Sequence, residues 1–257
     1  MGLEPFAHAN CSRPITVPVS NIGRSVIVEG NQVSGVYPDV LRELGAKAGC
    51  TFVFPSYPRA RSDQMFFEAG TSDIAIPASF VTERLQHATF IPLVKVLPTL
   101  VTIKPLTQPM TSVRQLFAAK ELRGAAVRGY TFGKEYQAMM NTLEEAGRID
   151  FTNDLLSIAR MLLAGRVDFA IMPPHVLRAL MDVAAAEKQT GVQLRSYPLV
   201  GLPHVDSGVY ISHRALSKED QAELYKLFTA GAKSDAFVKG HQKYYPTEIL
   251  KGVVTRP

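Results

Sequence analysis

Short apolar runs alternate with longer amphipathic segments along most of this chain. Runs rich in β-branched or small apolar residues predict buried strands, and the longer segments between them predict helices. In the first part of the chain we expect strands at 15–19, 26–28, 51–54 and 74–76, and helices at 39–44 and 60–69. This alternation predicts a parallel sheet with right-handed crossovers, as in α/β proteins.

The same alternation resumes after residue 105. Strands are expected at 124–127, 149–151, 169–171 and 192–196, and helices at 112–119, 132–145, 155–164 and 176–186. The chain then returns through a strand at 208–212 to helices at 218–231 and from 235 onwards. Between the two parts, an extended stretch at 93–103 predicts a strand that crosses from one lobe to the other.

One pattern, Gly-x-x-Asp-apolar-Ala-Ile, occurs at 70–76 and again at 165–171. Each copy follows an apolar helical run, so each predicts a helix ended by a glycine with positive φ, a short turn and a buried strand. Asp73 and Asp168 hold the same place before each strand, which favours a structural turn role over a catalytic one. Two such units indicate two similar α/β lobes with a cleft for a ligand between them.

The order of the segments predicts a discontinuous first lobe. We expect residues 1–104 and 201–257 to form the first lobe and residues 105–200 to form the second. No low-complexity linker separates them, so paired strands are expected to join the lobes. The predicted fold class is α/β, with each lobe a mostly parallel sheet flanked by helices.

Composition and charge exclude some classes of protein. Hydrophobic residues make up 46% of the chain and charged residues 20%, which is typical of a globular protein. The net charge is +5, but the lysines and arginines are scattered, so no nucleic-acid partner is expected. No apolar run approaches the roughly 18 residues that a membrane span needs.

The two cysteines, Cys11 and Cys50, each stand just before a predicted strand. If those strands are parallel neighbours, the sulfur atoms lie at the same end of the sheet and a disulfide is plausible. Two unrelated buried thiols are the alternative. Two cysteines cannot build a four-ligand zinc site, and the six histidines show no metal-ligand spacing, so no metal and no cofactor is expected.

Residues 1–10 contain no apolar signal core, so no targeting segment is visible. Ala7-His8-Ala9 does match the small-x-small pattern that precedes a signal-peptidase cut. A trimmed export product and a chance match both explain it.

Candidate binding residues follow the predicted strands. Arg128-Gly129-Tyr130-Thr131 lies between a strand and a helix, where free N–H groups and the helix dipole favour an anion; a plain N-cap role for Thr131 is the alternative. Arg84 follows the first repeat strand, where a guanidinium could form a two-pronged pair with a carboxylate; a surface arginine is the alternative.

Tyr57, Arg59 and Arg61 lie at another strand-to-helix turn on the same sheet edge. Ligands of open α/β sheets bind outside the carboxyl ends of the strands, so these residues are candidates for the cleft wall. Helix capping and solvation explain them equally well.

Several segments together resemble the bacterial periplasmic solute-binding proteins of ABC transporters, of the amino-acid-binding type (extracellular solute-binding family 3). They are residues 35–41, 82–84 and 127–131, the spacing from Gly165 to Asp168, and Tyr244-Tyr245. The resemblance covers nearly the whole chain. It implies a type II periplasmic-binding fold, in which two lobes joined by a two-strand hinge close over a small ligand.

The resemblance also implies roles for individual residues. Arg84 matches the family arginine that holds a ligand's carboxylate, and Tyr130 and Thr131 match second-lobe positions that meet the same group. Further first-lobe contacts would come from Asn21, Tyr57 and Ser79.

One place departs from the family pattern. An acid that pairs with the ligand's ammonium commonly follows the second repeat strand, but this chain has Pro173-Pro174-His175 there. A buried ammonium without a partner is costly, so either Asp206 meets the amine or the ligand is an organic acid. In the second case Arg84, with Arg59 or Arg128, would supply the positive charge, beside Pro173 and His175.

These inferences favour a non-catalytic periplasmic protein that captures a small carboxylate-bearing solute, an amino acid or a related organic acid. It would deliver that solute to an ABC permease in the inner membrane and act as a monomer. No P-loop, His-Glu-x-x-His or Gly-x-Ser-x-Gly motif is present. Two alternatives stay open: a cyclohexadienyl-dehydratase-like enzyme, with His175 as the candidate acid–base group, and a ligand-sensing domain.

Overall fold

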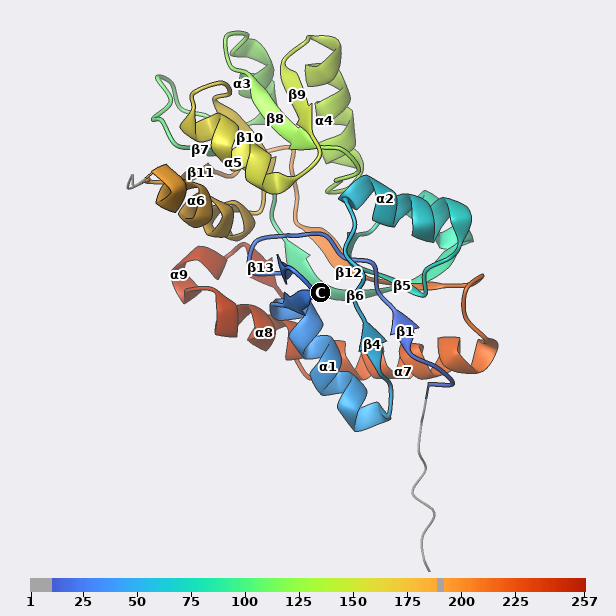
Figure 1. The fold of residues 1–257 in the computed structure, drawn as a ribbon. Coiled ribbons are helices and arrows are strands. Elements are labelled where there is room, and N and C mark those ends of the chain that lie inside the picture. The colour runs from blue at the N-terminus through green and yellow to red at the C-terminus, as the bar shows by residue number, and fades with distance from the viewer. Residues whose placement is uncertain (1–10, 189–191) are drawn as a thin grey trace, which may run out of the picture.

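The computed structural model describes residues 11–188 and 192–257, so the tripeptide Ala7-His8-Ala9 lies outside the described part. The chain forms two α/β lobes, of which the second, coloured green to yellow, lies above the first in Figure 1. This confirms the predicted two-lobe fold class. Within residues 11–188 and 192–257, no helix has the length and apolar character that crossing a membrane requires.

The first lobe contains a four-stranded sheet and a separate pair of strands. The sheet has the order β13 (Val254–Thr255), β6 (Ala88–Val96), β12 (Val205–Ser212) and β5 (Ile74–Ser79). Beside it, β1 (Ile15–Thr16) pairs in parallel with β4 (Phe52–Val53). The hairpin β2 (Ile27–Glu29) and β3 (Gln32–Ser34) precedes the first helix.

Helices cover this sheet and lead into the cleft. Helices α7 (Lys218–Lys233) and α8 (Ala236–Tyr244) pack on the sheet. Helix α1 (Val36–Ala48) packs on both of them and on β4, and the short α9 (Thr247–Leu250) packs on α8. The predicted helix at 60–69 divides into α2 (Arg59–Asp63) and a π-helical segment, η1 (Gln64–Ala69). A 3-10 helix, η2 (Thr82–Gln86), follows β5.

The second lobe is one five-stranded sheet between helices. Its strand order is β11 (Arg195–Tyr197), β7 (Thr99–Thr102), β10 (Phe169–Met172), β8 (Gly124–Val127) and β9 (Ile149–Thr152). Its helices are α3 (Val113–Ala118), α4 (Lys134–Glu145), α5 (Leu155–Leu163) and α6 (Pro174–Lys188). Strand β7 lies in this sheet although its residues fall inside the range predicted for the first lobe.

Strand directions are more mixed than the sequence predicts. Parallel pairing joins β1 to β4, β8 to β9 and β8 to β10, whereas all other pairs of described strands are antiparallel. Strands β6, β7, β11 and β12, which lead into or return from the crossing between the lobes, make most of the antiparallel pairs. Their direction depends on tertiary pairing that local residue patterns do not encode.

The crossing itself consists of two strands rather than one. Strand β6 ends at Val96, which pairs with Val205 of β12, and β7 begins at Thr99 in the other lobe. Leu97 still donates its N–H to the Val253 carbonyl at 2.9 Å. Proline, as at position 98, has no N–H to continue a ladder, which explains the break.

The cores of the two lobes are continuous. Strands of the second lobe are buried on both faces: Phe169 and Ile171 pack with α3 and α4, and Ala170 and Met172 pack with α5 and α6. The apolar cluster on the α5 side extends into the first lobe, where it includes Val96. The lobes are therefore in direct apolar contact.

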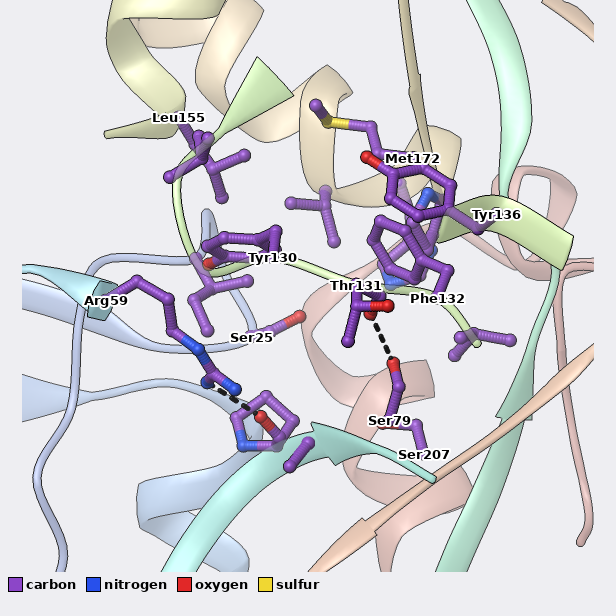
Figure 2. A pocket seen from close by; sticks show the side chains of 18 of the residues that line it. Ser25, Arg59, Ser79, Tyr130, Thr131, Phe132, Tyr136, Leu155, Met172 and Ser207 are labelled. Atoms are coloured by element: carbon purple, nitrogen blue, oxygen red, sulfur yellow. Dashed lines mark hydrogen bonds between the residues drawn. The ribbon is translucent and has the colours of Figure 1, made fainter. Parts of the chain in front are cut away.

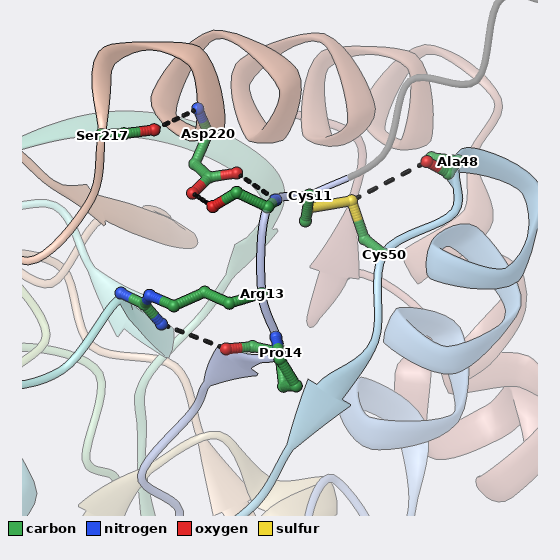
Figure 3. The surroundings of a disulfide bond; sticks show 8 residues. Cys11, Arg13, Pro14, Ala48, Cys50, Ser217 and Asp220 are labelled. Atoms are coloured by element: carbon green, nitrogen blue, oxygen red, sulfur yellow. Dashed lines mark hydrogen bonds between the residues drawn. A yellow bond between two sulfur atoms is a disulfide. The ribbon is translucent and has the colours of Figure 1, made fainter.

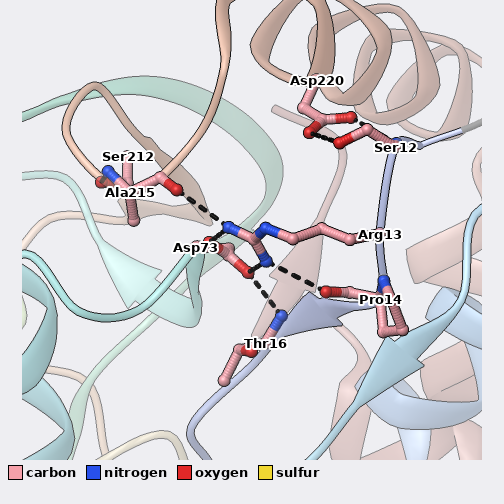
Figure 4. Close-up of polar contacts among 8 residues, drawn as sticks. All are labelled: Ser12, Arg13, Pro14, Thr16, Asp73, Ser212, Ala215 and Asp220. Atoms are coloured by element: carbon pink, nitrogen blue, oxygen red, sulfur yellow. Dashed lines mark hydrogen bonds and ion pairs between the residues drawn. The ribbon is translucent and has the colours of Figure 1, made fainter.

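A disulfide joins Cys11 and Cys50, with Cα atoms 4.9 Å apart, and confirms the predicted pairing (Figure 3). The next residue, Ser12, donates from its N–H and its hydroxyl to the buried Asp220 carboxylate, at 2.8 and 2.6 Å. Arg13 then forms a two-pronged pair with Asp73, at 2.7 Å for each bond (Figure 4). Three successive residues thus fasten the segment before β1 to the first lobe.

Candidate functional site

Two adjoining chambers lie in the cleft between the lobes. The inner chamber is narrow, with a cavity volume of about 70 Å³. Its lining is Ile22, Ser25, Tyr37, Arg59, Pro77, Ala78, Ser79, Val96, Ser207 and His241 from the first lobe, with Ala126, Val127, Tyr130, Thr131, Phe132, Tyr136, Leu155, Ile171, Met172, Pro173, His175 and Val176.

The outer chamber is wider and more charged. Its lining is Asp63, Phe80, Val81, Thr82, Glu83, Arg84, Val127, Gly129, Tyr130, Thr131, Gly133, Lys134, Glu135, Gln137, Phe151, Pro203, His204, Val205 and Asp206. Val127, Tyr130 and Thr131 line both chambers. The loop that carries Tyr130 and Thr131 therefore forms a wall between them.

This loop is one of the places where the lobes meet. The Ser79 hydroxyl, at the end of β5, donates to the Thr131 carbonyl at 2.7 Å (Figure 2). Gly129 has a φ of +84°, and a Cβ there would lie 3.3 Å from the Cα of Ala60 in α2. A side chain at position 129 would be strained and would press on the first lobe, so the glycine permits this close approach.

Arg59 is the charged side chain among the described residues that line the inner chamber. It projects from the start of α2 and donates from Nη1 to the Pro77 carbonyl at 3.1 Å (Figure 2). Its guanidinium lies over the Tyr130 ring, 5.5 Å from the centroid, a cation–π geometry. Burial raises the pKa of Tyr130 to about 12, so its hydroxyl stays neutral.

A single carboxylate joins Arg59 to Arg84. Asp63 lies 3.1 Å from Arg59 through Oδ1 and 3.1 Å from Arg84 through Oδ2. The Arg84 guanidinium also stacks on the Phe67 ring, 4.1 Å from its centroid. Burial lowers the pKa of Arg84, and the charge of Asp63 opposes that shift. The three groups form a charged cluster at the boundary of the two chambers.

The deep end of the inner chamber is polar but uncharged. His175 and His241 are 2% and 1% exposed, and their rings meet edge to face with centroids 5.7 Å apart. Burial lowers the pKa of His241 to about 4 and holds the pKa of His175 well below its usual value. The Tyr245 hydroxyl lies 3.0 Å from that of Ser25, and the Tyr245 ring meets that of His175 edge to face. This end presents neutral hydrogen-bonding groups.

The structure brings together most of the predicted site residues. The inner chamber includes Arg59, Ser79, Tyr130, Thr131, Pro173 and His175, and the outer chamber includes Arg84. Thr131 is not an N-cap, because α4 begins at Lys134 with Gly133 as its cap.

Three predicted residues lie outside both chambers. Asn21 is exposed, Tyr57 is 37% exposed before α2, and Arg128 lies over the Phe151 ring, 5.2 Å from its centroid. Each belongs to a turn next to the cleft, but its side chain lines neither chamber. Asp206, considered as a partner for an amine, lines the outer chamber and lies 3.9 Å from Lys95.

Sequence reasoning missed several residues of the site. Asp63 is four residues after Arg59, a spacing that predicts a helix-surface ion pair and could have drawn attention to it. Ser207 reaches the chamber because it pairs with Ser79 across β12 and β5. His241 comes from α8, far along the chain. Across residues 11–188 and 192–257, no cluster of three or more His, Cys, Asp or Glu side chains is placed to hold a metal.

Comparisons with known proteins give the fold. No protein-family model matches the chain, and no curated protein does. Among solved structures, a histidine kinase sensor domain similar to periplasmic binding proteins matches with a TM-score of 0.67 and 16% identity, over 95% of this chain and 98% of that one.

Two further structures match equally well. The ancestral amino-acid-binding protein AncCDT-1, a precursor of cyclohexadienyl dehydratase, has a TM-score of 0.67 and 17% identity, over 90% of this chain and 95% of its own. A putative L-cystine ABC transporter protein from Listeria monocytogenes has a TM-score of 0.67 and 14% identity, over 92% and 97%. The chain therefore has the two-lobe fold of type II periplasmic binding proteins.

Proposed function

We propose that this protein captures a small carboxylate-bearing solute, an amino acid or a related organic acid, by closing its two lobes over it. The observation that carries the proposal is the inner chamber, which both lobes enclose and in which Arg59 is the charged group of the described lining. Apolar walls with a few convergent polar groups are typical of small-molecule sites. As a periplasmic substrate-binding protein, it would hand the solute to an ABC permease.

The charged cluster of Arg59, Asp63 and Arg84 would recognise the carboxylate of the solute. A guanidinium matches a carboxylate through paired hydrogen bonds, and its attraction is stronger in a partly buried place than in water. The side chains of Arg59 and Arg84 are 12% and 17% exposed. With one shared acid, Asp63, the two arginines leave this three-residue cluster with a net charge of about +1.

A binding screen tests this function. Amino acids and organic acids would be added one by one, and the melting temperature measured; a ligand that binds the folded state raises it by mass action. We expect at least one carboxylate to raise it and the Arg59→Gln variant to lose the shift. If no compound in a broad panel changes the melting temperature, the proposal is wrong.

A sensing role is the second candidate, favoured by the match to nearly the whole of a histidine kinase sensor domain. Capture of the solute would be the same, and the closed form would contact a signalling partner instead of a permease. Affinity purification of the liganded protein from its native membranes, followed by mass spectrometry, separates the two: a permease subunit supports transport, and a kinase supports sensing.

The dehydratase alternative has weaker support in the chamber. Lyase chemistry needs a general acid or base, and the described lining contains no Asp or Glu. Burial keeps His175 and His241 neutral, so neither is a charged general acid, and a base role for either would have no second catalytic carboxylate in the described lining. Release of product from a cyclic acid such as prephenate, followed by absorbance, would overturn this assignment.

A further inference from the structure

The charged cluster of Arg59, Asp63 and Arg84 contains two hydrogen-bond donors without a partner. Arg59 Nε and Arg84 Nη1 are buried, and neither has a hydrogen-bond partner among the described residues. Donors left unpaired away from water are costly unless a partner reaches them. Together with the single acid shared by two guanidinium groups, these donors indicate a place for an anion.

Asp63 already holds the position that such an anion would take. Each of its two carboxylate oxygens lies 3.1 Å from one arginine, which is how a ligand carboxylate would bridge them. Asp63 is the last residue of α2, and its side chain is 16% exposed and lines the outer chamber. Its carboxylate can therefore turn toward water when it leaves the arginines.

The inner chamber offers nothing to balance an ammonium group. Its described lining includes no carboxylate, and the groups opposite Arg59 are neutral, among them Ser25, His175 and Ser207. The acids of the cleft lie in the outer chamber, where Asp206 joins Glu83 and Glu135; the Asp206 Oδ1 lies 3.9 Å from Lys95 and has no hydrogen-bond partner among the described residues. A positive charge inside would meet Arg59 and no counter-charge, which is unfavourable in a dry site.

Resting on the proposed function, we propose that Asp63 is an exchangeable counter-ion and that the solute is a small organic acid without an ammonium group. The carboxylate of the acid replaces Asp63 on Arg59 and Arg84, and its apolar body lies in the inner chamber. Asp63 is thus a specificity-determining residue: it keeps the arginines paired in the free protein and competes with every incoming anion.

The test compares two charge-removing variants. Asp63→Asn removes the competitor, and Asp150→Asn is the matched control, because Asp150 pairs with Arg123 on the second lobe and lines neither chamber. Calorimetry would measure binding of two acids, 3-phenylpropanoate and 4-methylpentanoate. It would also measure binding of phenylalanine and leucine, which have the same two carbon skeletons with an added ammonium group. Asp63→Ala serves as a second variant should the Asn variant fold poorly.

We expect Asp63→Asn to bind the two acids about tenfold more tightly than the wild type, the effect of losing one charge-assisted competitor. Asp150→Asn should match the wild type, and each amino acid should bind at least about tenfold more weakly than its acid. Unchanged binding of the acids by Asp63→Asn and Asp63→Ala would overturn the exchange, and weaker binding would overturn it by showing that Asp63 positions the arginines instead.

Two other outcomes distinguish failure of this inference from failure of the proposed function. If the amino acids bind more tightly than the acids, a solute is captured but the assigned class is wrong. If neither acids nor amino acids bind the wild type or any variant, the proposed function fails, and this inference with it.

Discussion

Asp73 and Asp168 make the same pair of backbone hydrogen bonds in the two lobes. The Asp73 N–H donates to the Thr16 carbonyl at 3.3 Å, and the Thr16 N–H donates to the Asp73 carboxylate at 2.7 Å. The Asp168 N–H donates to the Arg123 carbonyl at 2.7 Å, and the Arg123 N–H donates to the Asp168 carboxylate at 3.0 Å. Each aspartate fastens its strand to a neighbouring segment, which confirms the structural role predicted from the repeat.

The two aspartates differ in what else they bind, and this predicts unequal effects on stability. Asp73 is 2% exposed and also holds Arg13, whereas Asp168 is more accessible. We expect Asp73→Ala to lower the free energy of unfolding by about 2–3 kcal/mol and Asp168→Ala by about 1 kcal/mol. Urea unfolding of both variants measures this, and equal losses would contradict it.

The disulfide should contribute to the stability of the first lobe. It closes a loop with a sequence separation of 39 residues, and such a cross-link restricts the unfolded chain by about 3–4 kcal/mol in the chain-entropy description. Reduction, or the double variant Cys11→Ser with Cys50→Ser, should lower the urea midpoint. Because the bond lies away from the cleft, ligand affinity at low temperature should not change; a loss of affinity would show that the bond supports the site.

Acid should destabilise the protein through its buried histidines. His241 has a pKa near 4 in the folded state, below the value of about 6.5 in an unfolded chain. The unfolded chain therefore takes up a proton between pH 6.5 and 4 that the folded protein does not. This contribution is complete above pH 6.5 and is lost as the pH falls, by about 3 kcal/mol at pH 4.

The histidine contribution can be isolated by substitution. His241→Asn keeps a donor for the Phe237 carbonyl, which His241 Nδ1 contacts at 2.7 Å, but cannot titrate. The free energy of unfolding of this variant should fall less steeply between pH 6.5 and 4 than that of the wild type. The exposed His213 gives the control, since His213→Gln should keep the wild-type slope. Parallel curves for all three proteins would refute the prediction.

Loss of the bond between Ser79 and Thr131 should favour the open form. Ser79→Ala removes one hydrogen bond between the lobes, worth about 1 kcal/mol, and should weaken solute binding by about fivefold. Ser196→Ala removes a hydroxyl pair with Thr99 inside the second-lobe sheet and should leave affinity unchanged. Small-angle scattering of the free Ser79 variant should show a larger radius of gyration; identical curves would mean that this bond does not hold the lobes.

The sequence predicts an element well where its own residues show a clear apolar run or a helical hydrophobic period. The strand expected at 124–127 coincides with β8, and the predicted helix at 218–231 falls within α7. Strand β13, of two residues, and helix α9, of four residues, are too short to show a hydrophobic period and were missed. Their existence depends on contacts that only the folded chain supplies.

The site is partly predictable for the same reason. Residues at the ends of predicted strands, such as Ser79 and Thr131, could be placed at the cleft because the topology of an α/β sheet fixes where its strands end. Tyr57 and Arg128 also follow strands, but side-chain direction is set by packing, which turned them away. His241 required knowledge of how α8 docks, which no local pattern gives.

The way β6 is held has a mechanical consequence for any movement of the lobes. Strand β6 pairs with β12 on one edge along its length and with β13 on the other edge at Lys95 and Val96. We therefore expect β6 to move as a rigid part of the first lobe up to Val96. Bending is then expected at residues 97–98 and 203–204, because Val200 is hydrogen-bonded to Thr111 and Val113 and so stays with the second lobe. Such a short pivot allows rotation about nearly one axis, so a single pair of distance labels, one on each lobe, would follow the whole motion.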